Sequence, residues 1–171
     1  MSPRPARKPS VPTGLQPSFP TSPDPAERYR QYFPRVFAYV YGRTRDTRAT
    51  EDLASEVFTR ALSEAHALPD EAAFETRLFT LARDLLIIHS RSQTPRNDAP
   101  DDDPLPRPDV ARVLNHLRRL ALREQDIVAL KFDAQLANAQ IAQVMGLSEG
   151  KVRAILYRTL RHISKALQRE G

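Results

Sequence analysis

The chain has 171 residues, no cysteine, and a formal net charge of +5 with a pI near 9.9. The lack of cysteine excludes disulfides, thiolate catalysis and cysteine-based zinc sites, and it fits a reducing cytoplasm. The positive charge favours a polyanionic partner, and nucleic acid is the first candidate.

Residues 1–25 are rich in proline and lack any apolar period, so they predict a disordered tail. From Glu27 a helical period begins. Its apolar and aromatic members are Tyr29, Tyr32, Phe33, Val36, Phe37, Val40 and Tyr41. Because Pro34 lies inside this helix, the sequence predicts a kink or a restart near Phe33.

A second helix is expected from Glu51 to about Ala65, with Thr50 as its N-cap and acidic residues in its first turn. Its apolar side comprises Leu53, Val57, Phe58, Ala61 and Leu62. Its outer side comprises Glu51, Asp52, Ser55, Glu56 and Arg60. This helix should therefore present an acidic front.

A third amphipathic helix should follow the loop at residues 67–71 and end near Ser92. Its apolar side comprises Phe74, Leu78, Leu81, Ala82, Leu85 and Leu86, and its outer side comprises Arg77, Arg83, Asp84 and Arg91. Three such helices with short connections predict a compact bundle at residues 26–92.

Residues 93–109 carry five aspartates against two arginines among prolines, which predicts a flexible acidic linker. A second helical domain, residues 110–171, holds 11 basic and five acidic residues. The fold class is therefore all-α, with two small helical domains.

Residues 138–157 read as a helix-turn-helix, in which Gly146 takes positive φ at the bend and Ser148 caps the second helix. The second helix has an inward stripe of Val152, Ile155, Leu156, Thr159, Leu160, Ile163 and Leu167. Its other side carries Lys151, Arg153, Ala154, Tyr157, Arg158 and Arg161. Such side chains suit phosphate contact and major-groove reading, although an ordinary hairpin with a solvated basic face is the alternative.

No catalytic or cofactor motif is found: the chain has only five glycines and no GxSxG, Walker or GxGxxG pattern. Its four histidines stand too far apart to predict a metal site. The longest aliphatic run, residues 85–88, is far shorter than a membrane span. We therefore expect a cytoplasmic protein that is not an enzyme and needs no cofactor.

The order of these elements resembles the bacterial sigma factors of extracytoplasmic-function type, which belong to the sigma-70 family. YFPRVFAYVYGR (32–43), TEDLASEVFTRAL (50–62) and FETRLFTLARDLLIIHSR (74–91) resemble the family's region 2. LREQDIVALKF (122–132) and IAQVMGLSEGKVRAILYRTL (141–160) resemble its region 4.

The resemblance implies a promoter-specificity subunit of RNA polymerase. Core binding, to the clamp helices of the largest subunit, would involve Glu51, Asp52, Leu53, Glu56 and Phe58. The minus-10 element would meet Phe74, Arg77, Arg83, Asp84 and Arg91. The minus-35 element would meet Ser148, Lys151, Arg153, Ala154, Tyr157, Arg158 and Arg161. The flap of the second-largest subunit is a further partner, and the sequence leaves open whether an anti-sigma factor binds.

The chain departs from the family pattern at four places. Arg77 stands where tryptophan is usual, and Asp84 stands where asparagine is usual, so its carboxylate would be repelled by phosphates or would prefer a cytosine amine. Ala137 lacks the usual cap hydroxyl, leaving Asn138 as a shifted substitute, and Gln140 replaces a glutamate. Two rivals remain: a free helix-turn-helix regulator, and an interaction module that has lost promoter activity.

Overall fold

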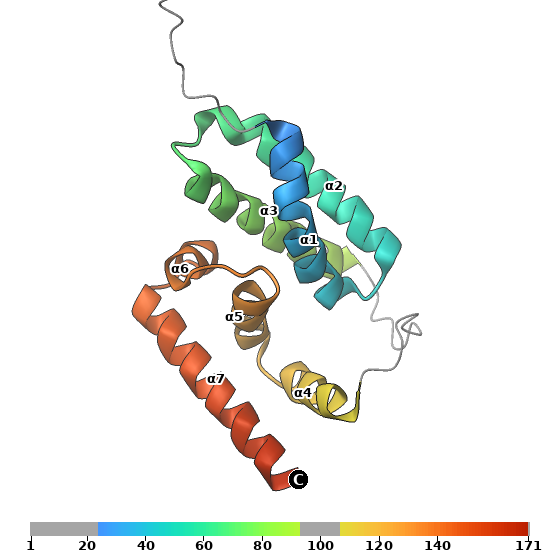
Figure 1. The fold of residues 1–171 in the computed structure, drawn as a ribbon, viewed down its shortest axis with the longest axis vertical. Coiled ribbons are helices and arrows are strands. Elements are labelled where there is room, and N and C mark those ends of the chain that lie inside the picture. The colour runs from blue at the N-terminus through green and yellow to red at the C-terminus, as the bar shows by residue number, and fades with distance from the viewer. Residues whose placement is uncertain (1–23, 93–106, 171) are drawn as a thin grey trace, which may run out of the picture.

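A computed structural model describes residues 24–92 and 107–170 (Figure 1). Every regular element within these two ranges is a helix. The elements are α1 (Pro25–Thr44), α2 (Thr47–Glu64), the 3-10 helix η1 (Ala65–Ala67), α3 (Glu71–Ser92), α4 (Pro108–Arg118), α5 (Leu122–Phe132), α6 (Asn138–Met145) and α7 (Glu149–Glu170). The all-α class is confirmed. Most of the expected tail and of the expected linker lie outside the described residues. The last two residues of the predicted tail, Asp24 and Pro25, cap and begin α1, and the last predicted linker residues belong to the first turn of α4.

Helix α1 runs through Pro34 as one element, so the predicted restart near Phe33 is wrong. Proline removes the N–H that would bond to the carbonyl of Arg30. Both Pro34 and Arg30 are exposed, so water can satisfy that carbonyl. The chain tolerates the proline because it lies on the solvent side of the helix.

Asp46 caps α2, where the sequence suggested Thr50. Oδ1 of Asp46 accepts a hydrogen bond of 2.9 Å from the N–H of Ala49. Thr50 lies one turn inside the helix, where it is buried and donates to the carbonyl of Asp46 at 2.7 Å. The helix therefore starts a turn earlier than predicted, directly after Arg45 ends α1 in a left-handed conformation with φ 51°.

The core of the first domain, α1–α3, contains most of the predicted apolar residues and two large ones that the sequence pattern missed, Tyr39 and Phe79. Arg28 is also buried there: its guanidinium lies 4.2 Å from the centre of the Phe74 ring and 2.9 Å from Glu71. This pairing joins the first turn of α1 to the first turn of α3. Burial, and then the hydrogen bond to Glu71, raise the pKa of the neighbouring Tyr32.

The second domain, α4–α7, is built around Ile127, Leu130, Leu136, Ile141 and Val152, all fully buried. Two expectations need correction here. Leu160 is 42% exposed and does not belong to the inward stripe of α7.

Nor does Asn138 cap α6, because it is the first residue of that helix. Ala137 occupies the cap position and has no side-chain acceptor. Gln140 compensates from the first turn, because its Oε1 accepts a hydrogen bond of 3.0 Å from the N–H of Ala137. Gln140, which stands where the family usually has glutamate, therefore provides the hydrogen-bond acceptor for a backbone N–H at the start of the helix-turn-helix.

The turn between α6 and α7 follows the sequence prediction: Gly146 has φ 62°, and Oγ of Ser148 accepts a 3.3 Å hydrogen bond from the N–H of Lys151. We expect Gly146→Ala to lower the free energy of unfolding by about 1 to 2 kcal/mol, because a Cβ is disfavoured at this φ. Gly150→Ala, inside α7, is the matched control, and should stabilise by up to about 1 kcal/mol. A Cβ meets nothing within 4 Å at either position, so urea titrations of the two variants isolate the effect of φ. Equal unfolding midpoints would contradict it.

Candidate nucleic-acid and protein interfaces

The outer face of α2 carries three exposed carboxylates, Glu51, Asp52 and Glu56, which we call the acidic α2 surface. The hydrophobic residues Leu53 and Phe58, 8% and 3% exposed, lie beneath it in the core and hold the helix in place. Glu56 pairs with Arg60 one turn later, and Asp52 and Glu56 border a shallow hollow of about 310 Å³. The surface offers negative charge on a rigid helix.

The outer face of α7 is basic, and we call it the basic α7 face. Its members are all exposed: Ser148, Lys151, Arg153, Ala154, Tyr157, Arg158 and Arg161. Tyr157 is 63% exposed, and Arg153 lies 3.2 Å from Glu149 one turn earlier. Helix α7 runs along the edge of the molecule farthest from α2 (Figure 1). A duplex can therefore approach this face without meeting the acidic α2 surface.

The residues expected at the minus-10 element are not brought together. Phe74 is fully buried in the core of the first domain, so it cannot touch DNA in this structure. Asp84 and Arg91 are exposed, whereas Arg83 is half-buried and directed at the second domain.

Arg77 spans the α2–α3 loop to Glu64, with nitrogen–oxygen distances of 2.5 and 3.0 Å. The hydrogen bond from Arg77 lowers the pKa of Glu64, and the same bond raises the pKa of Arg77. The arginine at the usual tryptophan position thus joins the two ends of the loop formed by η1 and the residues after it.

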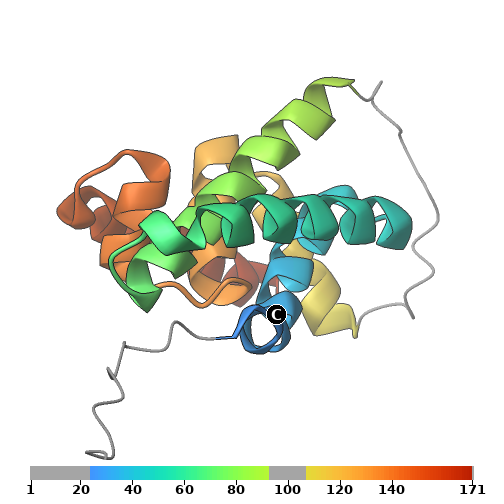
Figure 2. The ribbon, with the colours of Figure 1, turned by 90° about the horizontal axis from the view of Figure 1, so that it is seen from above.

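Contacts between the two domains form a feature that the sequence did not predict. Helix α3 packs on α6, and α1 touches α5 (Figures 1 and 2). Asp126 of α5 lies 2.5 Å from Arg43 and 3.7 Å from Arg83. These three residues lie on the polar sides of their helices, and the hydrophobic period of a helix does not indicate which polar residues will pair across domains.

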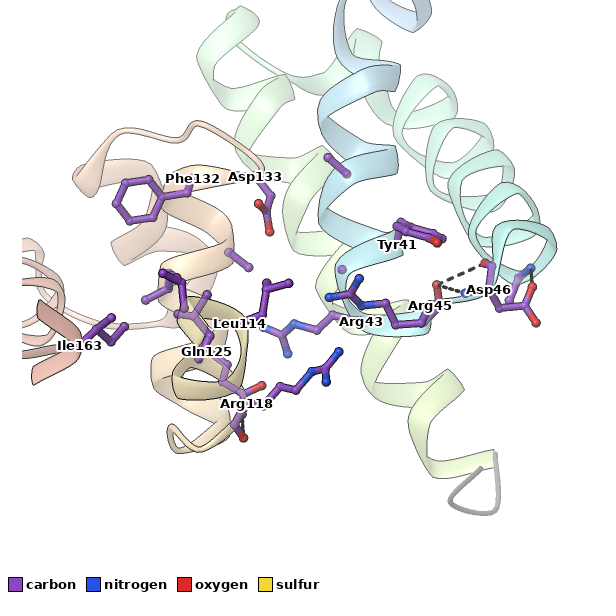
Figure 3. A pocket seen from close by; sticks show the side chains of 18 of the residues that line it. Tyr41, Arg43, Arg45, Asp46, Leu114, Arg118, Gln125, Phe132, Asp133 and Ile163 are labelled. Carbon is purple, nitrogen blue, oxygen red and sulfur yellow. Dashed lines mark hydrogen bonds between the residues drawn. The ribbon is translucent and has the colours of Figure 1, made fainter. Parts of the chain in front are cut away.

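A cleft of about 1000 Å³ lies between the end of α1 and helices α4, α5 and α7 (Figure 3). Its second-domain wall is largely apolar and includes Leu114, Leu117, Val128, Phe132 and Ile163. Its first-domain wall includes Tyr41, Arg43 and Arg45. Asp133 also lines it, and burial of the carboxyl raises its pKa, which Arg43 and Arg45 oppose.

This shift predicts a pH-dependent effect of Asp133→Asn. A carboxyl whose pKa is higher in the folded state than in the unfolded chain favours folding at low pH, and this contribution disappears as the pH rises through the folded pKa. At pH 7 the ionised carboxylate is therefore unfavourable, and Asp133→Asn should raise the melting temperature slightly. The difference from the parent should vanish when the carboxyl is protonated in both states, near pH 2. A variant that melts below the parent at pH 7 would show that attraction to the two arginines outweighs burial.

Among residues 24–92 and 107–170 there is no group of three or more histidines and carboxylates that could hold a metal ion. In the same part of the chain, no helix is both long and apolar enough to cross a bilayer.

Comparison with known proteins gives two family matches. Residues 28–96 match Sigma-70 region 2, and residues 116–165 match Sigma-70, region 4. Together they cover more than half of the chain and include most of α1, all of α2 and α3, the end of α4, all of α5 and α6, and most of α7.

The chain is 32% identical over 154 residues to the ECF RNA polymerase sigma factor BldN of Streptomyces coelicolor, covering 81% of this chain but only 58% of BldN. It is 24% identical to the RNA polymerase sigma factor YlaC of Bacillus subtilis, covering 80% of this chain and 88% of YlaC. Among solved structures, the sigma factor RpoE in complex with the anti-sigma factor NepR from Bartonella quintana has a TM-score of 0.67 at 14% identity, over 84% of this chain and 96% of that one. That last likeness concerns the fold alone.

Proposed function

Because the chain belongs to the sigma-70 family, as a sigma factor of the extracytoplasmic-function type, we propose that it binds the RNA polymerase core and directs it to promoters. In this proposal residues 26–92 bind the core and the minus-10 element, and residues 110–171 bind the minus-35 element. The protein acts as a specificity subunit in the cytoplasm and catalyses no reaction of its own.

The acidic α2 surface is the proposed contact with the clamp helices of the polymerase's largest subunit. Asp52 and Glu56 point outward from a helix whose other side is locked into the core by Leu53 and Phe58. A preorganised row of charge steers a partner of opposite sign and fixes its register. Phosphates would be repelled by the same row, which argues against DNA as the ligand of α2.

The basic α7 face is the proposed reader of the minus-35 element. The start of α7 is exposed and is held by the turn at Gly146 and the cap at Ser148. A recognition helix inserts its N-terminal part in the major groove. In this docking Arg153 and Arg158 supply contacts to guanine edges and phosphates, and Tyr157 offers a ring for apolar contact.

The minus-10 contact is proposed for Arg77, Asp84 and Arg91, with Arg83 joining them when it is released from Asp126. Single-stranded DNA is bound by cationic grooves that follow its backbone. Asp84 is 54% exposed at its side chain and lies 4.0 Å from Arg83, which reduces its repulsion of phosphate. Its carboxylate can accept a hydrogen bond from a cytosine amine, so we propose an altered base preference at this position.

One observation carries the proposal: the exposed acidic residues lie on α2 and the exposed basic residues on α7, and these two helices belong to different domains and lie at opposite edges of the molecule (Figure 1). A free helix-turn-helix regulator would need only the basic α7 face, because it does not bind the polymerase. The direct test adds the purified full-length chain to core polymerase on a library of bacterial promoters. Transcripts should start at defined sites that share two unlike sequence elements. A palindromic binding site without initiation would instead identify the free regulator.

A further inference from the structure

The ion pair between Glu64, the last residue of α2, and Arg77, in the second turn of α3, has a bidentate geometry. Nε of Arg77 lies 2.5 Å from one carboxylate oxygen of Glu64, and Nη2 lies 3.0 Å from the other. Two parallel N–H···O bonds fix the plane of a guanidinium as well as its position. Arg77 is therefore held in one orientation, although 38% of its side chain is exposed.

Helix stability does not explain why a carboxylate stands at the end of α2. The C-terminal end of a helix carries partial negative charge, which repels an anionic side chain in the last turn. The side chain of Glu64 is also 41% exposed, and water screens an ion pair that is exposed to this degree, so the pair adds little to the free energy of unfolding. Its clearest effect is on the orientation of Arg77.

The outer end of the Arg77 guanidinium is not used by this pair. An arginine has five N–H groups, and Glu64 accepts hydrogen bonds from two of them, one on Nε and one on Nη2. Because the group is planar, one N–H of Nη1 and the other N–H of Nη2 form a second fork at the outer end. A fork of two donors matches the O6 and N7 acceptors of guanine, which is the commonest base-specific contact of arginine.

The charges around Arg77 favour a base edge over a phosphate. Glu64 neutralises the guanidinium at short range, and Asp84 lies on the same side of α3 about two turns later. The hydrogen bond to Glu64 and the charge of Asp84 both raise the pKa of Arg77, so the group stays cationic. The two carboxylates would repel an anionic phosphate, whereas they do not repel the uncharged O6 and N7 atoms of guanine.

The loop between α2 and α3 is fixed at both ends beside Arg77. Its 3-10 turn is closed by a backbone hydrogen bond of 3.3 Å from Leu68 to Ala65. At its other end Asp70 caps α3, because its Oδ1 accepts a 2.8 Å hydrogen bond from the N–H of Ala73. With the ion pair at its start and the cap at its end, the loop and Arg77 form one preorganised surface.

We propose that Arg77, oriented by Glu64, reads a guanine of the minus-10 element through the two outer N–H groups of its guanidinium. Glu64 is then a positioning residue. The base preference of this chain should differ from that of relatives with tryptophan at this position, because an indole offers a single N–H donor. This inference rests on the proposed function and names a base that the first domain selects.

A chemical change in the DNA tests the contact without altering the protein. The full-length chain and core polymerase transcribe promoters with a randomised minus-10 element, and one position should be enriched in guanine by at least about fivefold. Replacing that guanine with 7-deazaguanine removes the N7 acceptor and keeps the Watson–Crick edge. Transcription by the parent should then fall about threefold to tenfold, whereas Arg77→Ala should transcribe both templates equally.

Two protein variants separate base reading from support of the loop. Glu64→Gln releases the guanidinium and should reduce the guanine preference by about threefold or more, while the melting temperature changes by no more than about 3 °C. The charge exchange, Glu64→Arg with Arg77→Glu, keeps an ion pair across the loop and removes the fork from α3. The guanine preference should therefore stay lost. If the exchange restores it, the pair only supports the loop and the proposal is wrong.

Glu27→Gln is the matched control, because it makes the same charge change at an exposed position in the first turn of α1. It should keep the guanine preference of the parent, and an equal loss would reduce the effect to net charge. A parent that initiates at defined sites without preferring guanine, or without responding to 7-deazaguanine, would overturn this inference and leave the proposed function standing. A parent that does not initiate with core would instead remove the proposed function itself.

Discussion

Reversing Asp52 and Glu56 to lysine will abolish co-purification with core RNA polymerase while leaving the circular dichroism spectrum and the melting temperature close to those of the parent. Both side chains are exposed, and the core residues beneath them, Leu53 and Phe58, are untouched. Complementary charge across the proposed clamp interface would become like-charge repulsion, which costs several kcal/mol. At about 1.4 kcal/mol per tenfold, this corresponds to a loss of binding of at least about a hundredfold.

Two further variants make this test specific. Asp52→Asn with Glu56→Gln removes the attraction without adding repulsion, so its affinity should lie between those of the parent and the lysine variant. Glu27→Lys with Glu124→Lys makes the same total charge change at two positions outside the acidic α2 surface, and should bind core normally. If the folded lysine variant binds core as well as the parent, the assignment of α2 to the polymerase has to be given up.

Arg158→Ala and Arg153→Ala will each weaken binding to duplex DNA carrying the minus-35 element, by about 1 to 3 kcal/mol where the arginine makes a bidentate base contact. A lost phosphate contact should instead reduce the slope of log affinity against log salt by about one. Fluorescence anisotropy at several salt concentrations separates the two cases. Arg153 must also exchange its contact with Glu149 for one with DNA, so its net effect should be the smaller.

Arg169→Ala is the control, because Arg169 is an exposed arginine in the last turn of the same helix. Major-groove docking concerns the N-terminal part of a recognition helix, so this variant should bind like the parent. Weakening by Arg169→Ala equal to that by Arg158→Ala would indicate diffuse electrostatic attraction in place of specific docking.

The sequence was a good guide to the helices because each has one apolar side, and the 3.6-residue period exposes that side directly. Val36, Leu78 and Val152 were all placed in the core and are fully buried. The turn at Gly146 could also be predicted from the sequence, because a helix that ends in a residue with positive φ usually has glycine there.

The errors arose where several local solutions compete. Thr50 and Asp46 both have side chains that can cap a helix, and only the left-handed Arg45 before Asp46 decides between them. Whether a helix continues through a proline such as Pro34 depends in part on whether water can reach the freed carbonyl, which is set by tertiary contacts. Leu160 lies at the border of the apolar stripe, where the packing of α4 and α5 against α7 sets its exposure.

The domain contacts were beyond sequence reasoning for a different reason. Arg43, Arg83 and Asp126 all lie on polar faces, which the hydrophobic pattern assigns to solvent. Their pairing depends on how α1 and α3 are oriented against α5, and no local period encodes that orientation. The sequence consequently predicts Arg77, Arg83, Asp84 and Arg91 as one outer side of the third helix, whereas the structure turns Arg83 toward Asp126 of the second domain.

The burial of Tyr39 allows a structural change in the protein to be followed by its own ultraviolet absorbance. The chain has no tryptophan, so its near-ultraviolet absorption is dominated by five tyrosines. Tyr39 is 1% exposed and packs edge-on against Phe79 at 6.0 Å. Burial, followed by the negative charge of Asp126 from the other domain, raises its pKa above the ordinary value near 10. Tyr39 should therefore stay un-ionised in alkali until the core around it unfolds, so the late part of the rise in tyrosinate absorbance, seen without any added label, would report the unfolding of that core.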